Sequence, residues 1–203
     1  TKVWNDKLNR RDFIPSVEES LRKLQLDRVD LLLIHWPPDG PLEESVEQLV
    51  AARDRQLTRL IGVSNFPTAL LQRTLDLGAD IVTNQVEYHA LLDQSKVLNL
   101  LRNHGMFLTA YSPIGQGAVV DDPTLREIGA AHGKSAAQVA LRWLVQQGDV
   151  AAIPRTTRPE RLQTNIDLFD FVLSTDEMAT VTALTHRHER QVDPPFAPAW
   201  DQP

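Results

Sequence analysis

Short apolar segments alternate along the chain with longer amphipathic segments, in a repeat of about 30 residues that is typical of βα units. In the segment 29–35, VDLLLIH, the residues from Leu31 to Ile34 are all apolar and leave no polar face for solvent. Such a segment is typical of a parallel strand that is covered on both faces. The pattern predicts strands at 29–35, 60–65, 81–87, 107–112 and 150–154, and the end of a further strand at 1–4.

Helices are predicted between these strands, where apolar positions recur with the period of an amphipathic helix. Ser174 and Glu177 have the spacing of a capping box and mark the start of the last helix. The predicted helices are 13–26, 42–56, 68–78, 95–105, 123–133, 135–148, 159–170 and 174–186.

Polar side chains stand at the carboxyl ends of the predicted strands. In a (β/α)8 TIM barrel all these ends meet at one face and build a single site. A doubly wound sheet collects them near a switch point instead and usually carries G-x-G-x-x-G after its first strand, a sequence that is absent here. The absence favours an α/β barrel. The strand-end residues are Lys2, His35, Ser64, Asn65, Gln85, Glu87, Tyr111, Ser112 and Arg155.

His35 follows its apolar run directly, so it lies at the edge where α/β proteins bind ligands. A histidine inside a strand is more often a core residue whose hydrogen bonds are satisfied. Position alone leaves the two interpretations equally open.

Composition restricts the class of protein further. With 203 residues and 42% hydrophobic content, the chain can bury one substantial core, and we expect a single domain, 1–203. The absence of cysteine excludes disulfides, thiolate metal sites and cysteine nucleophiles. The net charge of −6 creates no field that attracts nucleic acid, so an anionic ligand requires a local arginine cluster. Without a signal-peptide region or an apolar stretch near the roughly 20 residues of a membrane span, we expect a cytoplasmic protein.

Six motifs occur in an order and spacing that resemble those of the aldo-keto reductases: TKVW, VDLLLIHWP, LIGVSNF, NQVEYH, AYSPIG and IPRTTRPERLQTN. The resemblance covers essentially the whole chain. The tail FAPAWD and the short loop after His35 are most similar to the bacterial 2,5-diketo-D-gluconic acid reductase branch. The resemblance implies a (β/α)8 barrel that transfers hydride between NADP(H) and a carbonyl or alcohol.

The resemblance also implies roles for residues at two strand ends. His35 matches the histidine that hydrogen-bonds the substrate carbonyl, and Trp36 beside it is expected to form an apolar wall, together with Trp200 of the tail. Lys2 matches the lysine that pairs with an aspartate and lowers the pKa of a catalytic tyrosine. Such groups stabilise the negative charge that develops on the carbonyl oxygen. The alternative for Lys2 is a solvated lysine at a chain end.

A cofactor site is implied at the other strand ends. Amide and hydroxyl groups there provide the donors and acceptors that a nicotinamide amide needs. The Tyr111 ring is expected to stack on the nicotinamide, the alternative being an ordinary aromatic residue at the barrel rim. The cofactor-binding candidates are Ser64, Asn65, Gln85, Tyr111, Ser112, Ile114, Arg155, Thr156, Thr157, Arg161 and Asn165.

Arg155, Arg158 and Arg161 cluster where a helix is predicted to begin, a place that favours phosphate through guanidinium groups and free backbone N–H groups. The alternative is a solvated face. The resemblance places the adenosine 2′-phosphate there and the adenine against Asn165. Two departures from the family pattern occur: Arg155 stands where many relatives have lysine, and Gln116 replaces the usual serine of the pyrophosphate loop.

The aspartate and the tyrosine of the reductase site belong to a region upstream of TKVW that has no counterpart here. Because a typical barrel has about 250 residues, we expect about 50 to 60 to precede this sequence, which then holds the end of strand 3 to strand 8, the C-terminal three quarters. A product of 203 residues is the alternative. Tyr88 and Tyr111 are the tyrosines present, and neither fits the proton donor.

The predicted function is NADPH-dependent reduction of small polar carbonyls such as 2,5-diketo-D-gluconate and methylglyoxal, by a monomer without a nucleic-acid or membrane partner. The alternatives are a catalytically inert NADP(H)-binding barrel with a regulatory or structural role, and an inactive fragment. Surface roles are expected for His104, His132, His186 and His188, a core role for Trp143, and no metal site.

Overall fold

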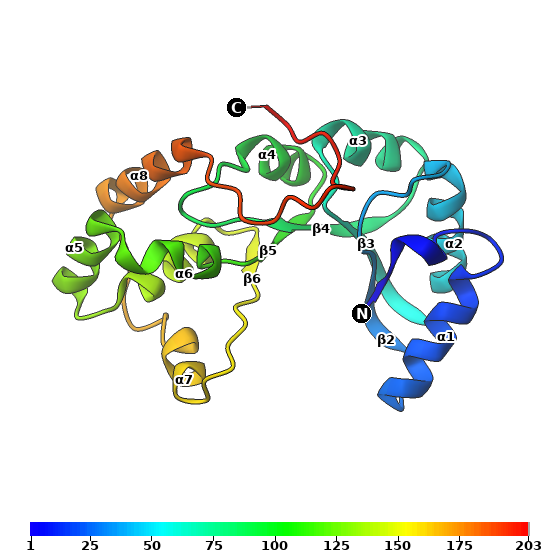
Figure 1. The fold of residues 1–203 in the computed structure, drawn as a ribbon, viewed down its shortest axis with the longest axis horizontal. Coiled ribbons are helices and arrows are strands. Elements are labelled where there is room, and N and C mark those ends of the chain that lie inside the picture. The colour runs from blue at the N-terminus through cyan, green and yellow to red at the C-terminus, as the bar shows by residue number, and fades with distance from the viewer. Residues whose placement is uncertain (203) are drawn as a thin grey trace. The chain divides into compact units, whose positions relative to one another are not determined.

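The strands of the sheet follow one another in sequence order, β1-β2-β3-β4-β5-β6, in the computed structural model, which describes residues 1–202 (Figure 1). The pairs β1–β2, β2–β3, β3–β4 and β5–β6 are parallel. A doubly wound sheet would reverse its strand order at a switch point, so this order excludes it and confirms the predicted βα repeats. The strands are β1 (Lys2–Val3), β2 (Val29–Ile34), β3 (Thr58–Ser64), β4 (Ile81–Glu87), β5 (Phe107–Tyr111) and β6 (Val150–Ala152).

Helices connect the strands where the sequence predicts them, and the capping box of Ser174 and Glu177 begins the last one. No helix within residues 1–202 has both the length and the apolar character that crossing a membrane requires. The helices are α1 (Phe13–Leu24), α2 (Leu42–Asp54), α3 (Thr68–Asp76), α4 (Ser95–Asn103), α5 (Pro123–His132), α6 (Ala136–Gln146), α7 (Glu160–Ile166) and α8 (Thr175–Leu184). Short 3-10 segments cover Asn5–Lys7, Gly115–Asp121 and Thr185–Arg187.

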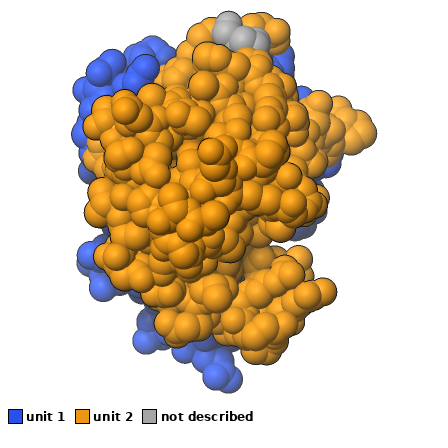
Figure 2. Space-filling model, turned by 90° about the vertical axis from the view of Figure 1, so that its left-hand side faces the viewer, with its two compact units in different colours: residues 1–85, 99–106, 196–201 blue, residues 86–98, 107–195, 202–203 orange. Residues whose placement is uncertain are grey.

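The chain forms two compact units, coloured separately in Figure 2. The first comprises residues 1–85, 99–106 and 196–201, and the second comprises 86–98, 107–195 and the last residues of the chain. In the first unit, Leu32 of β2 and Ile61 of β3 are fully buried together with Phe13 of α1 and Leu49 of α2. The apolar run that predicted a covered strand therefore forms the core of this unit.

Trp143 of α6 is fully buried in the second unit, which confirms its predicted core role. Its ring lies 5.2 Å from the ring of Tyr88, and its indole N–H donates to the Thr182 hydroxyl at 3.0 Å. Each polar group of this aromatic pair thus has a partner, because the Tyr88 hydroxyl donates to Gln147 Oε1 at 2.9 Å.

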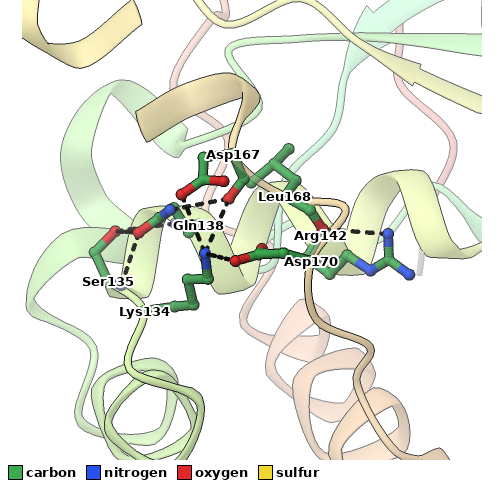
Figure 3. A network of polar contacts seen from close by, with 7 residues as sticks. All are labelled: Lys134, Ser135, Gln138, Arg142, Asp167, Leu168 and Asp170. Carbon is green, nitrogen blue, oxygen red and sulfur yellow. Dashed lines mark hydrogen bonds and ion pairs between the residues drawn. The ribbon is translucent and has the colours of Figure 1, made fainter. Parts of the chain in front are cut away.

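Helix α7 is shorter than predicted and ends at Ile166, so the prediction of helix through 167–170 is wrong. The carbonyl groups of Asp167 and Leu168 accept hydrogen bonds from Gln138 (3.1 Å) and Arg142 (3.3 Å), which are one turn apart on α6 (Figure 3). The Leu168 side chain is also buried. Tertiary contacts thus hold this segment away from helical geometry, although its sequence period is helical.

A register shift distinguishes the pairing of β3 with β4. Ile61 pairs with Ile81, whereas Val63 pairs with Asn84, so β4 carries an extra residue opposite Gly62. A Cβ atom on Gly62 would lie 2.7 Å from the carbonyl oxygen of Thr83 and 2.7 Å from Leu33 Cδ2. Only glycine allows the backbones to approach this closely beside the bulge.

We expect Gly62→Ala to lower the free energy of unfolding by about 1–3 kcal/mol, because the methyl group overpacks a site bounded by backbone. Gly40→Ala is the matched control, since a Cβ atom there meets nothing within 4 Å. Urea unfolding of both variants gives the comparison. An unfolding midpoint for Gly62→Ala equal to that of Gly40→Ala would contradict the close approach.

Candidate active site

Three predicted site residues of the first unit lie in a row across the ends of β2, β3 and β4. Ser64 is in register with Gln85, and Ile34 is in register with Val63, so His35 follows opposite Ser64. Parallel pairing is the cause, because it brings the carboxyl ends of successive strands to one edge. The expectation that these strand-end residues gather is thus met for the first unit.

Hydrogen bonds to main-chain carbonyl groups fix this row. The Asn65 backbone N–H donates to the Gln85 carbonyl at 2.9 Å, and the Ser64 hydroxyl donates to the same oxygen at 2.8 Å. The Asn65 amide Nδ2 donates to the His35 carbonyl at 3.0 Å. Asn65 adopts a left-handed conformation with φ of 63°, which asparagine tolerates better than most residues. Ser64 and Asn65 are buried and connect three strand ends.

Lys2 Nζ donates a hydrogen bond to Gln85 Oε1, a pairing that the sequence did not predict. Lys2 lies on β1 and Gln85 on β4, and two strands stand between them. In a flat sheet three strand spacings would separate them by about 14 Å, with side chains roughly perpendicular to the sheet. The contact therefore requires the sheet of the first unit to curve, with both side chains on its concave face.

The His35 imidazole is held in place and kept neutral. The Trp4 ring packs edge-on against it with centroids 4.8 Å apart, and the His35 backbone N–H donates to the Val3 carbonyl at 3.0 Å. Burial, followed by the positive charge of Lys2, lowers the pKa of His35 to about 4. Burial also lowers the pKa of the Lys2 ammonium. Within residues 1–202, neither ring nitrogen of His35 has a hydrogen-bond partner, so a neutral donor remains for a ligand.

Aromatic side chains surround this imidazole. Trp36 is only 5% exposed, because the rings of Phe196 and Trp200 pack against it at 5.4 and 6.1 Å. Trp4 and Phe196 are each 47% exposed and pack against one another. Neither Trp4 nor Phe196 was predicted as a site residue. For Trp4 the signal was present, since it stands at a strand end like the other candidates, whereas nothing local marks Phe196.

The C-terminal tail reaches this site because Asp201 is fixed at the start of α3. Its carboxylate accepts hydrogen bonds from the Thr68 backbone N–H at 2.9 Å and from the Thr68 hydroxyl at 2.5 Å. An acidic side chain satisfies the free N–H groups at a helix N-terminus, as a local capping residue would. The tail thus brings Phe196 and Trp200 to Trp36.

The candidates of the second unit fall into two groups, the first of which follows β5. Tyr111 ends the strand, and burial, followed by the negative charge of Glu87, raises the pKa of its hydroxyl. Ser112 has a positive φ of 46°, and its carbonyl accepts from the Gly115 N–H at 2.8 Å, which forms a tight turn. Ile114 and the exposed Gln116 follow in this turn.

The second group follows β6. Arg155, Arg158 and Arg161 are exposed, and within residues 1–202 their guanidinium groups make no ion pair or hydrogen bond. The Thr156 hydroxyl accepts from the Arg158 backbone N–H at 3.0 Å and so shapes the turn before α7. Thr157 is exposed in this turn, and Asn165 is partly buried on α7. The three cations thus lack the carboxylate partners that many other arginines of the chain have.

Histidines outside the site have different surroundings. His104, His186 and His188 are exposed, as predicted. His132 is partly exposed, and its Nε2 lies 2.8 Å from Glu177 Oε1, a partner that the sequence did not predict. In the part of the chain that the structure describes, no cluster of three or more histidine, aspartate or glutamate side chains could hold a metal ion.

Sequence comparisons find proteins similar to this chain. Residues 1–186 match the sequence model described as "Aldo/keto reductase family". Methylglyoxal reductase DkgB of Salmonella typhimurium is 38% identical over 207 residues, which cover 99% of this chain and 77% of that protein.

Solved structures are similar over most of the chain. A putative 2,5-diketo-D-gluconic acid reductase B is 50% identical, with a TM-score of 0.97 over 100% of this chain and 73% of that chain. A mutant of the protein Gox0644 in complex with NADPH is 35% identical, with a TM-score of 0.87 over 91% of this chain and 69% of that chain.

We expect His35 to titrate near pH 4 in the folded protein, as followed by histidine side-chain NMR. Lys2→Met should raise this pKa only in part, because burial is the larger cause and remains. Between the ordinary value of 6.5 and the folded value of about 4, the unfolded chain binds more protons at His35. The stability contribution of neutral His35 is therefore lost as the pH falls across this window. Titration near 6.5 would contradict the half-buried, neutral imidazole.

Proposed function

Since the chain belongs to the aldo/keto reductase family, we propose that it reduces small polar carbonyls, such as methylglyoxal and keto sugars, to alcohols with NADPH. The names of its relatives support this substrate class, because they include methylglyoxal and glyoxal reductases and a 2,5-diketo-D-gluconic acid reductase. The NADPH complex of a similar structure supports the cofactor.

The neutral imidazole of His35 beside the Lys2 ammonium carries the proposal. A neutral histidine with unpartnered ring nitrogens can donate an N–H to a carbonyl oxygen and orient it. The positive charge of Lys2 stabilises the negative charge that develops on that oxygen, and it does so more strongly because both groups are partly withdrawn from water. Trp4 and Phe196 offer exposed aromatic surface near His35, which suits a small substrate.

Neither tyrosine of the chain suits the proton transfer that a reduction requires. The Tyr88 hydroxyl is buried and donates to Gln147, and the raised pKa of Tyr111 makes it a weak acid. The family resemblance assigns proton donation to another tyrosine. We therefore limit the roles of this chain to orienting the carbonyl, stabilising charge and binding the cofactor.

The arginines after β6 fit a phosphate-bearing cofactor. Three exposed guanidinium groups, which have no carboxylate partner among residues 1–202, provide charge-assisted donors for phosphate oxygens. Arg155, Thr156, Thr157, Arg161 and Asn165 would hold the adenosine 2′-phosphate and adenine. Tyr111, Ser112 and Ile114 would line the path to the nicotinamide, and Ser64, Asn65 and Gln85 would hold its amide. When bound, the reduced cofactor supplies the hydride.

The curved sheet fits this function. Sequential parallel strands whose side chains meet across a concave face, as those of Lys2 and Gln85 do, are typical of a barrel wall. We propose that the sheet is part of a (β/α)8 barrel.

Replacing Arg161 with alanine should weaken NADPH binding by about 10-fold or more while changing NADH binding little, because each charge-assisted hydrogen bond contributes about 1.5–3 kcal/mol. Fluorescence titration with both cofactors measures the difference. Arg59→Ala is the control, since Arg59 is an exposed arginine that pairs with Asp30 at the amino end of β3. Equal losses for NADPH and NADH would exclude a 2′-phosphate site at Arg161.

Replacing His35 with alanine should lower kcat/KM for methylglyoxal by about 100-fold or more, because it removes a donor aimed at developing charge. NADPH affinity should stay within about twofold, since His35 acts on the substrate. His104→Ala, an exposed histidine of the same unit, should leave both unchanged. A comparable loss of NADPH affinity in His35→Ala would assign His35 a structural role instead.

A further inference from the structure

Glu87, the last residue of β4, carries a buried carboxylate that the proposed reaction does not use. Its side chain is 0% exposed. Alternation along the strand places it on the same face as Gln85, two residues earlier. Burying an ionised carboxylate costs free energy unless hydrogen-bond donors surround it, so its partners indicate the role of the charge.

The principal partners are backbone N–H groups from the C-terminal part of the chain. The Gln191 N–H donates to Oε1 at 2.7 Å, and the Val192 N–H donates to Oε2 at 2.9 Å. Arg190 Nη1 lies 3.7 Å from Oε2. The two carboxylate oxygens thus bind the backbone N–H groups of two consecutive residues, Gln191 and Val192, which fixes the position and the direction of the chain there.

His89 orients the carboxylate from the other side. Its Nδ1 accepts from the Leu91 backbone N–H at 3.3 Å, so the ring proton lies on Nε2, which donates to Glu87 Oε1 at 3.1 Å. Burial on its own would raise the pKa of Glu87, but the hydrogen bonds from His89, Gln191 and Val192 outweigh it and hold the pKa below its ordinary value. The carboxylate is therefore ionised and accepts from all three donors.

Residues 193–200, which we call the strap, follow this anchor directly. The strap contains Phe196 and Trp200, whose rings pack against Trp36. At its far end, Asp201 is bonded to Thr68. The strap is thus flanked by two carboxylate contacts: Glu87 binds the backbone just before it, and Asp201, just after it, binds Thr68.

We propose that Glu87 is a positioning residue, whose carboxylate anchors the chain at Gln191 and Val192. Through the few residues that follow Val192, this anchor restrains Phe196, which packs against Trp4 and Trp36. The proposal rests on the proposed function for its catalytic part. Because Phe196 contacts Trp4 and Trp36, its effect falls on the binding of the carbonyl substrate. None of the cofactor candidates lies in the strap, although the Glu87 charge acts on Tyr111. NADPH affinity is therefore measured beside the carbonyl KM.

The test uses Glu87→Gln, which keeps the shape but replaces one acceptor oxygen by an NH2 donor that faces a backbone N–H. Hydrogen exchange at the Gln191 and Val192 amides should become roughly tenfold faster or more, because hydrogen bonds to a charged group are lost. KM for methylglyoxal should rise by about threefold or more, with NADPH affinity within about twofold.

Glu177→Gln is the matched control. Glu177 also pairs with a histidine, His132, and also accepts from a backbone N–H, that of Ser174, in the same unit as Glu87. Glu177→Gln therefore changes a Glu–His pair but leaves the contacts of the strap unchanged. Exchange at residues 191 and 192 and KM for methylglyoxal should stay as in the unmodified protein.

Three outcomes overturn the proposal. Unchanged exchange at residues 191 and 192 shows that Glu87 does not anchor the strap. Faster exchange with unchanged KM shows that the anchor has no effect on the carbonyl site. A loss of NADPH affinity equal to the rise in KM assigns the effect to the cofactor side. An unmodified protein that reduces no carbonyl refutes the proposed function and the catalytic part of this inference, whereas the exchange rates still decide the anchor.

Discussion

The parallel pairing of β1, β2, β3 and β4 is the constraint on which the candidate site depends. It aligns His35, Ser64 and Gln85 at one edge without any contact between their side chains being required. The curvature of the sheet then brings the Lys2 side chain to Gln85 across two intervening strands, a contact that parallel alignment alone does not provide. Gly62 belongs to the same constraint, since a larger residue would separate β3 from the bulge in β4.

Burial affects the polar residues at this edge in two ways. The Ser64 hydroxyl and the Asn65 side-chain amide donate hydrogen bonds to backbone carbonyls of neighbouring strands, so these donors are satisfied although both residues are buried. His35 differs from them, because within residues 1–202 its ring nitrogens have no hydrogen-bond partner, and partial burial lowers its pKa. The same edge thus combines a frame whose donors bind the backbone with an imidazole that can bind a ligand. A half-buried imidazole with a shifted pKa is a feature typical of functional sites.

The sequence predicted what local patterns determine. The apolar run before His35 located β2, and the capping box located the start of α8, because both signals lie within a few residues of the feature. The end of α7 was mispredicted because Gln138 and Arg142, about 25 to 30 residues earlier, bind the carbonyl groups of Asp167 and Leu168 and hold this segment outside the helix. The pairing of Lys2 with Gln85 depends on sheet curvature, and the packing of Phe196 depends on Asp201 binding Thr68. Neither has a signature in the local pattern of polar and apolar residues.

The two Glu–His pairs show why a motif does not reveal a role without its surroundings. Glu177 and His132 are partly exposed, and Glu177 accepts its backbone hydrogen bond from Ser174, three residues away, so this pair serves a helix start. Glu87 and His89 are fully buried, and the backbone partners of Glu87 come from about 100 residues later in the chain. A buried charge is tolerated only while its donors stay in place, which makes the carboxylate and the segment 191–192 depend on one another. That dependence fixes where the chain that leads into the strap begins, because Gln191 and Val192 are held by the carboxylate at the end of β4.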